Sequence, residues 1–235
     1  MGKFRACRLY LAAPPASFSA VLAFVLPDIS SAFAHYLQTT TRLELVAVAT
    51  GFACVWLAAR ESLWNFPVAI VSCALFIFVY YDARLYSDCY LQVLFIVLNG
   101  YGWYEWLYGG RGKTELPVTH TTFPEWLVGV LFVIAFTFGF GYYLRHYTDA
   151  ALPYIDSFTT AGSIVAQYQL TRKRLENWLL WLLVDVIYVP VLWYKELYFV
   201  SLLYALYLGL AAYGYWQWRR DLLAPRPAAP LGPAE

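Results

Sequence analysis

Charged residues are scarce in this chain. Of its 235 residues only 13% are charged, whereas 61% are hydrophobic and 20% are aromatic. A water-soluble domain would struggle to cover that apolar excess with polar surface. The few charges form short clusters between long neutral runs, a pattern typical of loops between membrane-spanning helices. The composition therefore predicts a polytopic helical membrane protein.

Reactive and metal-binding groups are also rare. The four cysteines show no paired spacing, and the three histidines are scattered through polar stretches, so neither a disulfide framework nor a metal site is indicated. There is no HExxH motif, no serine nucleophile elbow and no P-loop. A net charge of +1 leaves no electrostatic footprint for nucleic acid. These absences argue against an enzyme, a nucleotide-driven pump, a bound cofactor and a nucleic-acid partner.

Seven apolar segments approach the ~20 residues that a helix needs to cross a bilayer. They span about residues 43–59, 63–81, 87–108, 124–144, 157–171, 176–194 and 197–218. Within the amino-terminal segment 1–42, the stretch 17–38 carries Pro27, Asp28 and His35, so we expect it to lie at the membrane interface. The proline-rich residues 219–235 are expected to form a disordered tail.

Basic residues indicate how the segments are oriented. They follow the third, fifth and seventh crossings, at positions 111–113, 172–174 and 219–220. Because short loops rich in Lys and Arg stay in the cytoplasm, the carboxyl terminus is predicted to be cytoplasmic. Lys3, Arg5 and Arg8 argue the other way, because they would prefer the cytoplasm if an eighth crossing preceded the seven, and the sequence leaves that alternative open.

The chain resembles itself at an offset of 112 residues. The segments YGWYEW and YGYWQW align at this offset, so that Trp106 matches Trp218, and further back Asn65 matches Asn177. Shared leucines are common in apolar segments, but these matches at one register are improbable by chance. The pattern predicts an internal duplication.

The duplication predicts how the helices are arranged. Each unit, 43–108 and 157–218, holds three crossings, so two units joined directly would insert in opposite senses. The intervening region 109–156 supplies a cytoplasmic loop and one extra crossing, which turns the second unit over. We therefore expect two parallel three-helix repeats joined by a linker helix, with a central cleft between the repeats where a site could face either side in turn.

Asp185 is the sharpest polar feature, because it lies midway along an apolar crossing that contains no basic residue. Trp178 and Trp181 precede it by seven and four residues, so the three side chains face one way. A carboxylate beside indole rings favours a flat cationic ligand. The structural alternative is a carboxylate that bonds to nearby Tyr or Trp, or pairs with Lys195.

Amide side chains could read a neutral polar group of the same ligand. Gln92 and Asn99 lie seven residues apart and share a helix face, and an amide offers both a donor and an acceptor. Bonding between helices is an equally plausible role, worth about 0.6–2 kcal/mol. Asn65 and Asn177 begin matching crossings, where capping or ligand contact would serve. The candidate substrate-binding residues are Gln92, Asn99, Trp103, Asn65, Asn177, Trp178, Trp181, Asp185 and Tyr188.

Two long segments carry a family resemblance. LYSDCYLQVLFIVLNGYGWYEW and ENWLLWLLVDVIYVPVLWYKELYFVSLLYALYLGLAAYGYWQW resemble the PnuC-type nicotinamide riboside transporters, which are akin to the SWEET sugar carriers. The resemblance covers about residues 43–218. It implies a seven-helix protein of the bacterial inner membrane that forms a homotrimer and holds nicotinamide riboside between its repeats. It also implies facilitated diffusion, with phosphorylation in the cytoplasm drawing the nucleoside inward.

The family's motifs carry over residue by residue. They fall on Gln92, Asn99, Gly102, Trp103, Asn177, Trp178, Trp181, Asp185 and Lys195. The family's LY ahead of the lysine is here Leu192-Trp193-Tyr194, an altered spacing that puts a role for Tyr194 in doubt. Two alternatives remain, namely a transporter of thiamine or riboflavin with the same fold, and a membrane receptor or scaffold whose repeats serve assembly.

Overall fold

The computed structural model describes residues 42–82, 86–110, 112–148, 152–194 and 198–224. These residues form seven α-helices: α2 (Arg42–Ala59), α3 (Asn65–Asp82), α4 (Tyr86–Tyr108), α5 (Phe123–Tyr147), α6 (Pro153–Thr171), α7 (Asn177–Tyr194) and α8 (Tyr198–Leu223). Apart from one isolated bridge between Thr119 and Arg174, the described residues contain no β-structure. The prediction of an all-α chain is confirmed, and each predicted crossing overlaps one helix.

The two ends of the chain fit the predictions only in part. The interfacial position expected for residues 17–38 lies outside the described residues. Helix α8 continues to Leu223, beyond the crossing expected to end at 218. Its last turn includes Arg220, and a basic side chain near a helix carboxyl terminus interacts favourably with the helix dipole. The prolines of the predicted tail begin at Pro225, and residues 225–235 lie outside the described residues.

Helix α5 has clear signals at both of its ends. The backbone N–H and hydroxyl of Thr122 donate to the Glu125 carboxylate at 2.8 and 2.9 Å. Pro124 lies in the first turn, where its missing N–H has no intrahelical partner to lose. Arg145 and His146 lie in the last turn, where positive charge complements the helix dipole. These signals account for the boundaries of the helix between the two repeats.

Among the described helices, α5 alone is long and apolar enough to cross a membrane by length and hydropathy. The other candidates are shorter apolar stretches, such as Leu45–Ala59, Asn65–Phe78 and Asn177–Val191. The remaining helices include many Tyr and Trp residues and several buried amides. Such side chains lower a hydropathy average, although aromatic rings are common in membrane proteins. Length and hydropathy therefore give a weaker signal here than the repeat does.

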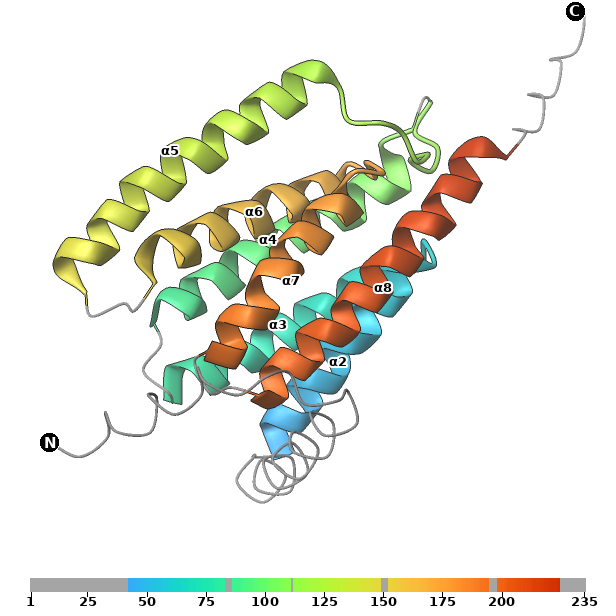
Figure 1. The fold of residues 1–235 in the computed structure, drawn as a ribbon. Coiled ribbons are helices and arrows are strands. Elements are labelled where there is room, and N and C mark those ends of the chain that lie inside the picture. The colour runs from blue at the N-terminus through green and yellow to red at the C-terminus, as the bar shows by residue number, and fades with distance from the viewer. Residues whose placement is uncertain (1–41, 83–85, 111, 149–151, 195–197, 225–235) are drawn as a thin grey trace, which may run out of the picture. The chain divides into compact units, whose positions relative to one another are not determined.

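The packing of the helices, which Figure 1 labels, follows the internal duplication. Helices α2, α3 and α4 match α6, α7 and α8 at the offset of 112 residues. Within the repeats, α2 packs on α3 and α3 on α4, just as α6 packs on α7 and α7 on α8. Between the repeats, α2 packs on α8 and α6 on α4. Each contact is the image of another, whereas α5 packs against α6 alone among the described helices.

The turns α2–α3 and α6–α7 have the same backbone conformation. Glu61 and Lys173 occupy equivalent positions in them, with φ angles of 55° and 53°. Left-handed backbone is uncommon outside glycine, so its repetition marks a shared turn geometry. Asn65 Nδ2 donates to the Ser62 carbonyl at 2.7 Å, and Asn177 Nδ2 donates to the Arg174 carbonyl at 2.6 Å. Both asparagines therefore close their turns by an equivalent bond.

Contacts between equivalent residues establish that the repeats run in the same sense. Glu61 forms an ion pair with Lys173, and the Trp106 ring lies 5.7 Å from the Trp218 ring. The α2–α3 and α6–α7 turns must therefore lie at one end of the bundle, which antiparallel repeats would not allow. We call this the turn end. The parallel arrangement of two three-helix repeats around a linker helix is thus the arrangement predicted from the sequence.

Candidate functional site

A layer of four aromatic rings fills the bundle near the turn end. It consists of Phe66, Trp106, Trp178 and Trp218, all fully or almost fully buried. Phe66 meets Trp106 edge-on with ring centroids 4.9 Å apart, and Trp178 meets Trp218 edge-on at 5.4 Å. Edge-to-face pairs of this kind are favourable beyond the area that they bury. We call these residues the tryptophan layer.

The tryptophan layer is held by reciprocal bonds between the repeats. Trp106 Nε1 donates to the Leu170 carbonyl and Trp218 Nε1 donates to the Ala58 carbonyl, both at 3.1 Å. In each bond, the third helix of one repeat is anchored to the first helix of the other. Buried indole N–H groups usually require such partners. The two repeats are therefore joined at this layer by the same hydrogen bond made in both directions.

Two glycines allow this close approach. A Cβ atom added at Gly102 would lie 2.6 Å from the Phe66 ring, and one added at Gly214 would lie 2.6 Å from the Trp178 ring. Distances this short are not tolerated without displacement of the ring or the helix. The paired Tyr-Gly motifs of the sequence therefore serve the packing of the tryptophan layer.

An ion pair lies beside this layer. Lys173 Nζ contacts Glu61 and also lies 4.7 Å from the centroid of the Trp106 ring. Burial raises the pKa of the Glu61 carboxyl, Lys173 opposes that rise, and nearby Asp221 adds to it. Because buried charges are costly unless paired, the two turns are tied together where the ion pair forms.

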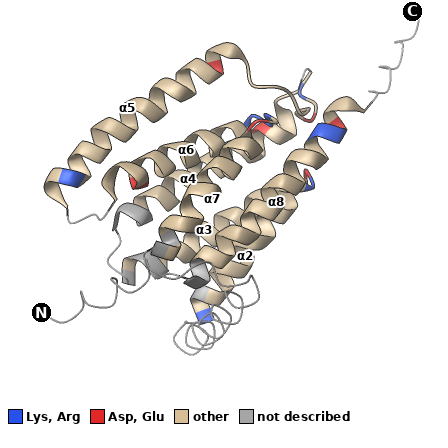
Figure 2. Cartoon of the chain, in the orientation of Figure 1, with Lys and Arg blue, Asp and Glu red and all other residues tan. Residues whose placement is uncertain are grey.

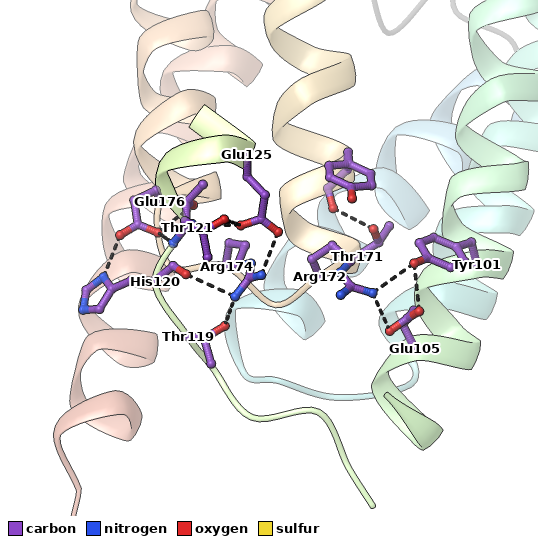
Figure 3. Close-up of polar contacts among 12 residues, drawn as sticks. Tyr101, Glu105, Thr119, His120, Thr121, Glu125, Thr171, Arg172, Arg174 and Glu176 are labelled. Atoms are coloured by element: carbon purple, nitrogen blue, oxygen red, sulfur yellow. Dashed lines mark hydrogen bonds and ion pairs between the residues drawn. The ribbon is translucent and has the colours of Figure 1, made fainter. Parts of the chain in front are cut away.

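The loop before α5 docks on the α6–α7 turn (Figure 3). Arg174 donates to Thr119 Oγ1 at 2.6 Å and to the His120 carbonyl at 3.1 Å, and forms an ion pair with Glu125 at 2.7 Å. A guanidinium suits this role because its donors diverge in one plane. Arg174 therefore fixes the linker helix to the second repeat.

Glu176 reinforces the same docking contact. Its carboxylate accepts hydrogen bonds from the backbone N–H and hydroxyl of Thr121, both at 2.8 Å, and lies 2.7 Å from His120 Nδ1. Burial raises the pKa of this carboxyl, but the bonds from His120 and Thr121 outweigh burial, so its pKa lies below the ordinary value. Most charged residues lie near helix ends and turns, as Figure 2 shows.

A second inter-repeat link joins α4 to the end of α6. Arg172 lies 3.0 Å from the Glu105 carboxylate and donates to the Tyr101 hydroxyl at 3.1 Å. Tyr101 in turn donates to Glu105 at 2.8 Å. The equivalent of Arg172 in the first repeat is Arg60, which instead lies over the Trp56 ring. The ionic link at this end is therefore made on one side only.

Deeper in the bundle, Asn99 forms a buried polar contact between the repeats. Asn99 is 4% exposed, and its Nδ2 donates to the Phe95 carbonyl at 2.8 Å. Its Oδ1 accepts a hydrogen bond from Gln167 Nε2 of α6 at 3.2 Å. The sequence predicted Asn99 as a site residue but did not single out Gln167.

Asp185 is buried in α7, with 4% of its surface exposed. Among the described residues no Lys or Arg forms an ion pair with it. Its proposed alternative partner Lys195 lies outside the described residues. The preceding Val184 packs against Gly162, and Trp181 packs against the buried core. A buried carboxylate without a described counter-ion is the kind of group that a cationic ligand would stabilise.

The remaining predicted residues are placed at several levels. Asn65 and Asn177 lie at the turn end, and Trp178 belongs to the tryptophan layer. Tyr188 stacks on Tyr204, with ring centroids 5.1 Å apart and an angle of 11° between the ring planes. Gln92 is partly buried and Trp103 is 40% exposed. The structure thus separates the predicted residues into a turn-end group and a deeper group.

The duplication provides an internal comparison for each of these residues. Asn65 and Asn177 are identical in the two repeats and make the same bond. The deeper polar or aromatic residues instead align with a different residue type in the other repeat. The aligned pairs are Gln92 with Tyr204, Asn99 with Ala211, Gln167 with Val55, Trp181 with Ala69, Asp185 with Cys73 and Tyr188 with Phe76. A symmetric frame needs the same residues twice, whereas an asymmetric ligand needs different groups from each half. Applied to the sequence alone, this comparison would have marked Gln167 together with Gln169, which matches Leu57.

Comparisons with known proteins match this architecture. The nicotinamide riboside transporter PnuC of Escherichia coli strain K12 is 29% identical over 201 residues, covering 75% of this chain and 84% of the relative. The riboflavin/roseoflavin transporter RibM of Streptomyces davaonensis is 28% identical over 212 residues, covering 87% and 98%. The crystal structure of the vitamin B3 transporter PnuC superposes with a TM-score of 0.62 and 26% identity, covering 89% of this chain and 93% of that chain.

The fold and these relatives define the class of protein as a multi-pass membrane transporter and not an enzyme. The more particular assignment follows from a family model described as nicotinamide mononucleotide transporter, which matches residues 41–220. The chain belongs to that family. The match extends from the start of α2 to the last turn of α8, so it includes both repeats and the linker helix.

Proposed function

We propose that this protein carries nicotinamide riboside across the membrane by alternating access, with the site between its two repeats. The observation that carries the proposal is the loss of repeat symmetry in the deeper part of an otherwise symmetric bundle. The names of the PnuC relatives support the choice of substrate. Nicotinamide riboside is a flat cation that also carries a carboxamide and ribose hydroxyls.

The deeper group of residues matches these chemical features. Asp185 would balance the pyridinium charge, and Trp181 would offer an indole face to the ring. Gln92 and Asn99 would read the carboxamide or the ribose hydroxyls, because an amide both donates and accepts. Tyr188 would contribute a second aromatic surface beside them. Trp103 is also proposed to contact the substrate, but it is 40% exposed here and would have to become more buried when the substrate binds.

The turn-end residues serve a different purpose in this proposal. Asn65, Asn177 and Trp178 belong to a frame that closes one end of the path, together with the Glu61–Lys173 ion pair. In alternating access, these turn-end contacts between the repeats would break while the opposite end of the path closes. The described conformation would then be the one sealed at the turn end.

The setting of transport follows from the same reasoning. The basic turns would place the turn end and the carboxyl terminus in the cytoplasm of a bacterial inner membrane. Passage would be facilitated diffusion, as in SWEET-like carriers, with phosphorylation of the arriving nucleoside preventing its return. Helix α5 packs on α6 alone among the described helices and exposes large apolar residues such as Phe138, which suits contact with lipid or with neighbours in a homotrimer.

Uptake into vesicles without an ion gradient tests this function. The purified chain should give saturable uptake of nicotinamide riboside, and Trp181→Ala or Gln92→Ala should weaken binding by about tenfold or more. Tyr90→Ala serves as the control, because Tyr90 is exposed on the same helix as Gln92. Unchanged affinity in both site variants would reject the proposed site. Absence of uptake with ligand bound would support the receptor or scaffold alternative instead.

Riboflavin is the second candidate substrate. The RibM relative, which is named for riboflavin and roseoflavin, matches this chain over nearly its whole length. Riboflavin is larger and uncharged, so it would make no use of the Asp185 carboxylate. Competition of labelled nicotinamide riboside by unlabelled riboflavin and thiamine decides among them. Stronger competition by either vitamin than by nicotinamide riboside itself would reassign the substrate.

A further inference from the structure

Two buried amides face each other across the repeats. Gln167 is 7% exposed, and its Nε2 donates to Asn99 Oδ1 at 3.2 Å. The Asn99 Nδ2 is already committed to the Phe95 carbonyl of its own helix at 2.8 Å. These two bonds orient the Asn99 oxygen toward α6. Gln167 therefore satisfies the one acceptor that Asn99 presents to the other repeat.

The equivalent interface shows that the fold does not require this amide pair. At the contact between α2 and α8, Val55 stands in the position of Gln167 and Ala211 in the position of Asn99. The equivalent helices α2 and α8 thus pack together without polar side chains at these two positions. Bonds between membrane helices add little net stability, and polar groups there are costly. Stability alone gives a poor account of the pair.

We propose that Gln167 is a positioning residue that occupies the Asn99 acceptor until a carboxamide N–H of the substrate replaces it. The inference rests on the proposed function, in which Asn99 reads the carboxamide. Substrate binding then replaces the Gln167 N–H on the Asn99 oxygen by a substrate N–H and releases the Gln167 amide from this bond. Because Asn99 and Gln167 belong to different repeats, the exchange also removes one of the hydrogen bonds that join α4 to α6. Occupancy of the site is thereby connected to the contact between the repeats.

A direct consequence is that substrate and Gln167 compete for Asn99. In Gln167→Leu the Asn99 oxygen remains buried without its donor, which raises the free energy of the empty protein. A ligand that donates an N–H recovers that loss on binding, and so should bind about two- to tenfold more tightly. A ligand without an N–H at that position recovers nothing. The sign of the effect therefore distinguishes competition from a merely structural role.

The test compares two ribosides that differ only at the carboxamide. Nicotinamide riboside and 3-acetylpyridine riboside are titrated by calorimetry into the purified full chain and into Gln167→Leu. The variant should bind nicotinamide riboside two- to tenfold more tightly and 3-acetylpyridine riboside with unchanged affinity. The control is Gln169→Leu, a buried glutamine two residues along α6 whose Oε1 has no partner among the described residues. It should change neither affinity.

Other outcomes overturn the inference in distinguishable ways. If the wild type binds nicotinamide riboside but the variant shifts both ligands equally, or neither, Gln167 does not compete and only this inference fails. If the wild type binds neither riboside, the proposed function fails and the inference with it. Gln167→Met, whose unbranched side chain is close to glutamine in shape, is measured beside the leucine variant. If neither variant folds, the amide is required by the fold and the inference is wrong.

Discussion

The turn end of the bundle and its deeper part differ in how far their contacts are repeated in the two halves. At the turn end, Trp106 and Trp218 make the same bond to the opposite repeat, and Glu61 meets its own equivalent Lys173. Deeper in the bundle, the Asn99–Gln167 pair has only small or apolar counterparts. We propose that the bonds repeated in both halves belong to the frame and that the deeper polar residues without such a counterpart form the ligand site.

Loss of the Glu61–Lys173 ion pair between the repeats should have the largest effect on stability. Lys173→Met leaves the mostly buried Glu61 carboxyl without its ion-pair partner. Removing one member of a fully buried pair costs about 3–5 kcal/mol, and the partial exposure of Glu61 reduces this to about 2–3 kcal/mol of unfolding free energy. Thermal unfolding in detergent measures the loss.

Exchanging the two charges tests whether the axis is a true symmetry element. In the double variant Glu61→Lys with Lys173→Glu, the new lysine would lie near Trp218 as the native one lies near Trp106. The exchange should therefore restore at least half of the stability lost in Lys173→Met. If the double variant is no more stable than the single one, the surroundings of the two positions are not equivalent.

A methyl group at Gly214 should disturb the frame somewhat less. In Gly214→Ala the new Cβ would lie 2.6 Å from the Trp178 ring, and such overpacking costs about 1–3 kcal/mol. Gly209→Ala on the same helix is the matched control, because nothing lies within 4 Å of its added Cβ. The control should be neutral or slightly stabilised, since alanine favours helix. Equal melting temperatures for the two variants would contradict the close packing described for the tryptophan layer.

In the deeper part of the bundle, Asp185→Asn tests whether the charge of Asp185 recognises the substrate. Removing the charge but keeping the shape should weaken binding of nicotinamide riboside about tenfold, which corresponds to about 1.4 kcal/mol. The uncharged dihydro form of the same riboside should lose little affinity. Calorimetry with both ligands measures the difference. A loss of equal size for the two would mean that Asp185 supports the fold and does not recognise charge.

The smallest effect is a pH dependence that differs between two turn-end carboxyls. The folded pKa of Glu176 lies below its ordinary value of 4.5, so its contribution to stability is present above that pH and is lost as the pH falls through the folded pKa. The folded pKa of Glu61 is raised, so stability increases as the pH falls through that value. Glu176→Gln should therefore flatten the loss of melting temperature in acid. Glu61→Gln should steepen it; the same pH profile in both variants would contradict these assignments.

Much of the fold could be predicted from the sequence because it rests on a repeat. Alignment of Trp106 with Trp218 and of Asn65 with Asn177 gave the two three-helix units, and an odd helix number required the linker. The reciprocal bonding of Trp106 and Trp218 to the opposite repeats could not be predicted, because backbone acceptors leave no mark on the sequence. The end of α8 was also missed, since its final turn is polar.

The site could be predicted only in part. Asn99 and Asp185 stood out because each is polar within an apolar crossing, and both are buried in the structure. Gln167 did not stand out, because α6 contains several polar residues and its glutamines resemble one another. Its bond to Asn99 depends on the contact between α4 and α6, which pattern alone does not determine. The binding role of the predicted residues stays a prediction.

The central claim is tested most directly by making the deeper residues symmetric. Asn99→Ala, Asp185→Cys and Trp181→Ala together give each position the residue that its counterpart carries in the other repeat. We expect this triple variant to fold, with its tryptophan layer intact by tryptophan fluorescence, and to show no calorimetric binding of nicotinamide riboside at concentrations that saturate the wild type. Binding of wild-type strength by the folded variant would show that broken symmetry does not mark the site.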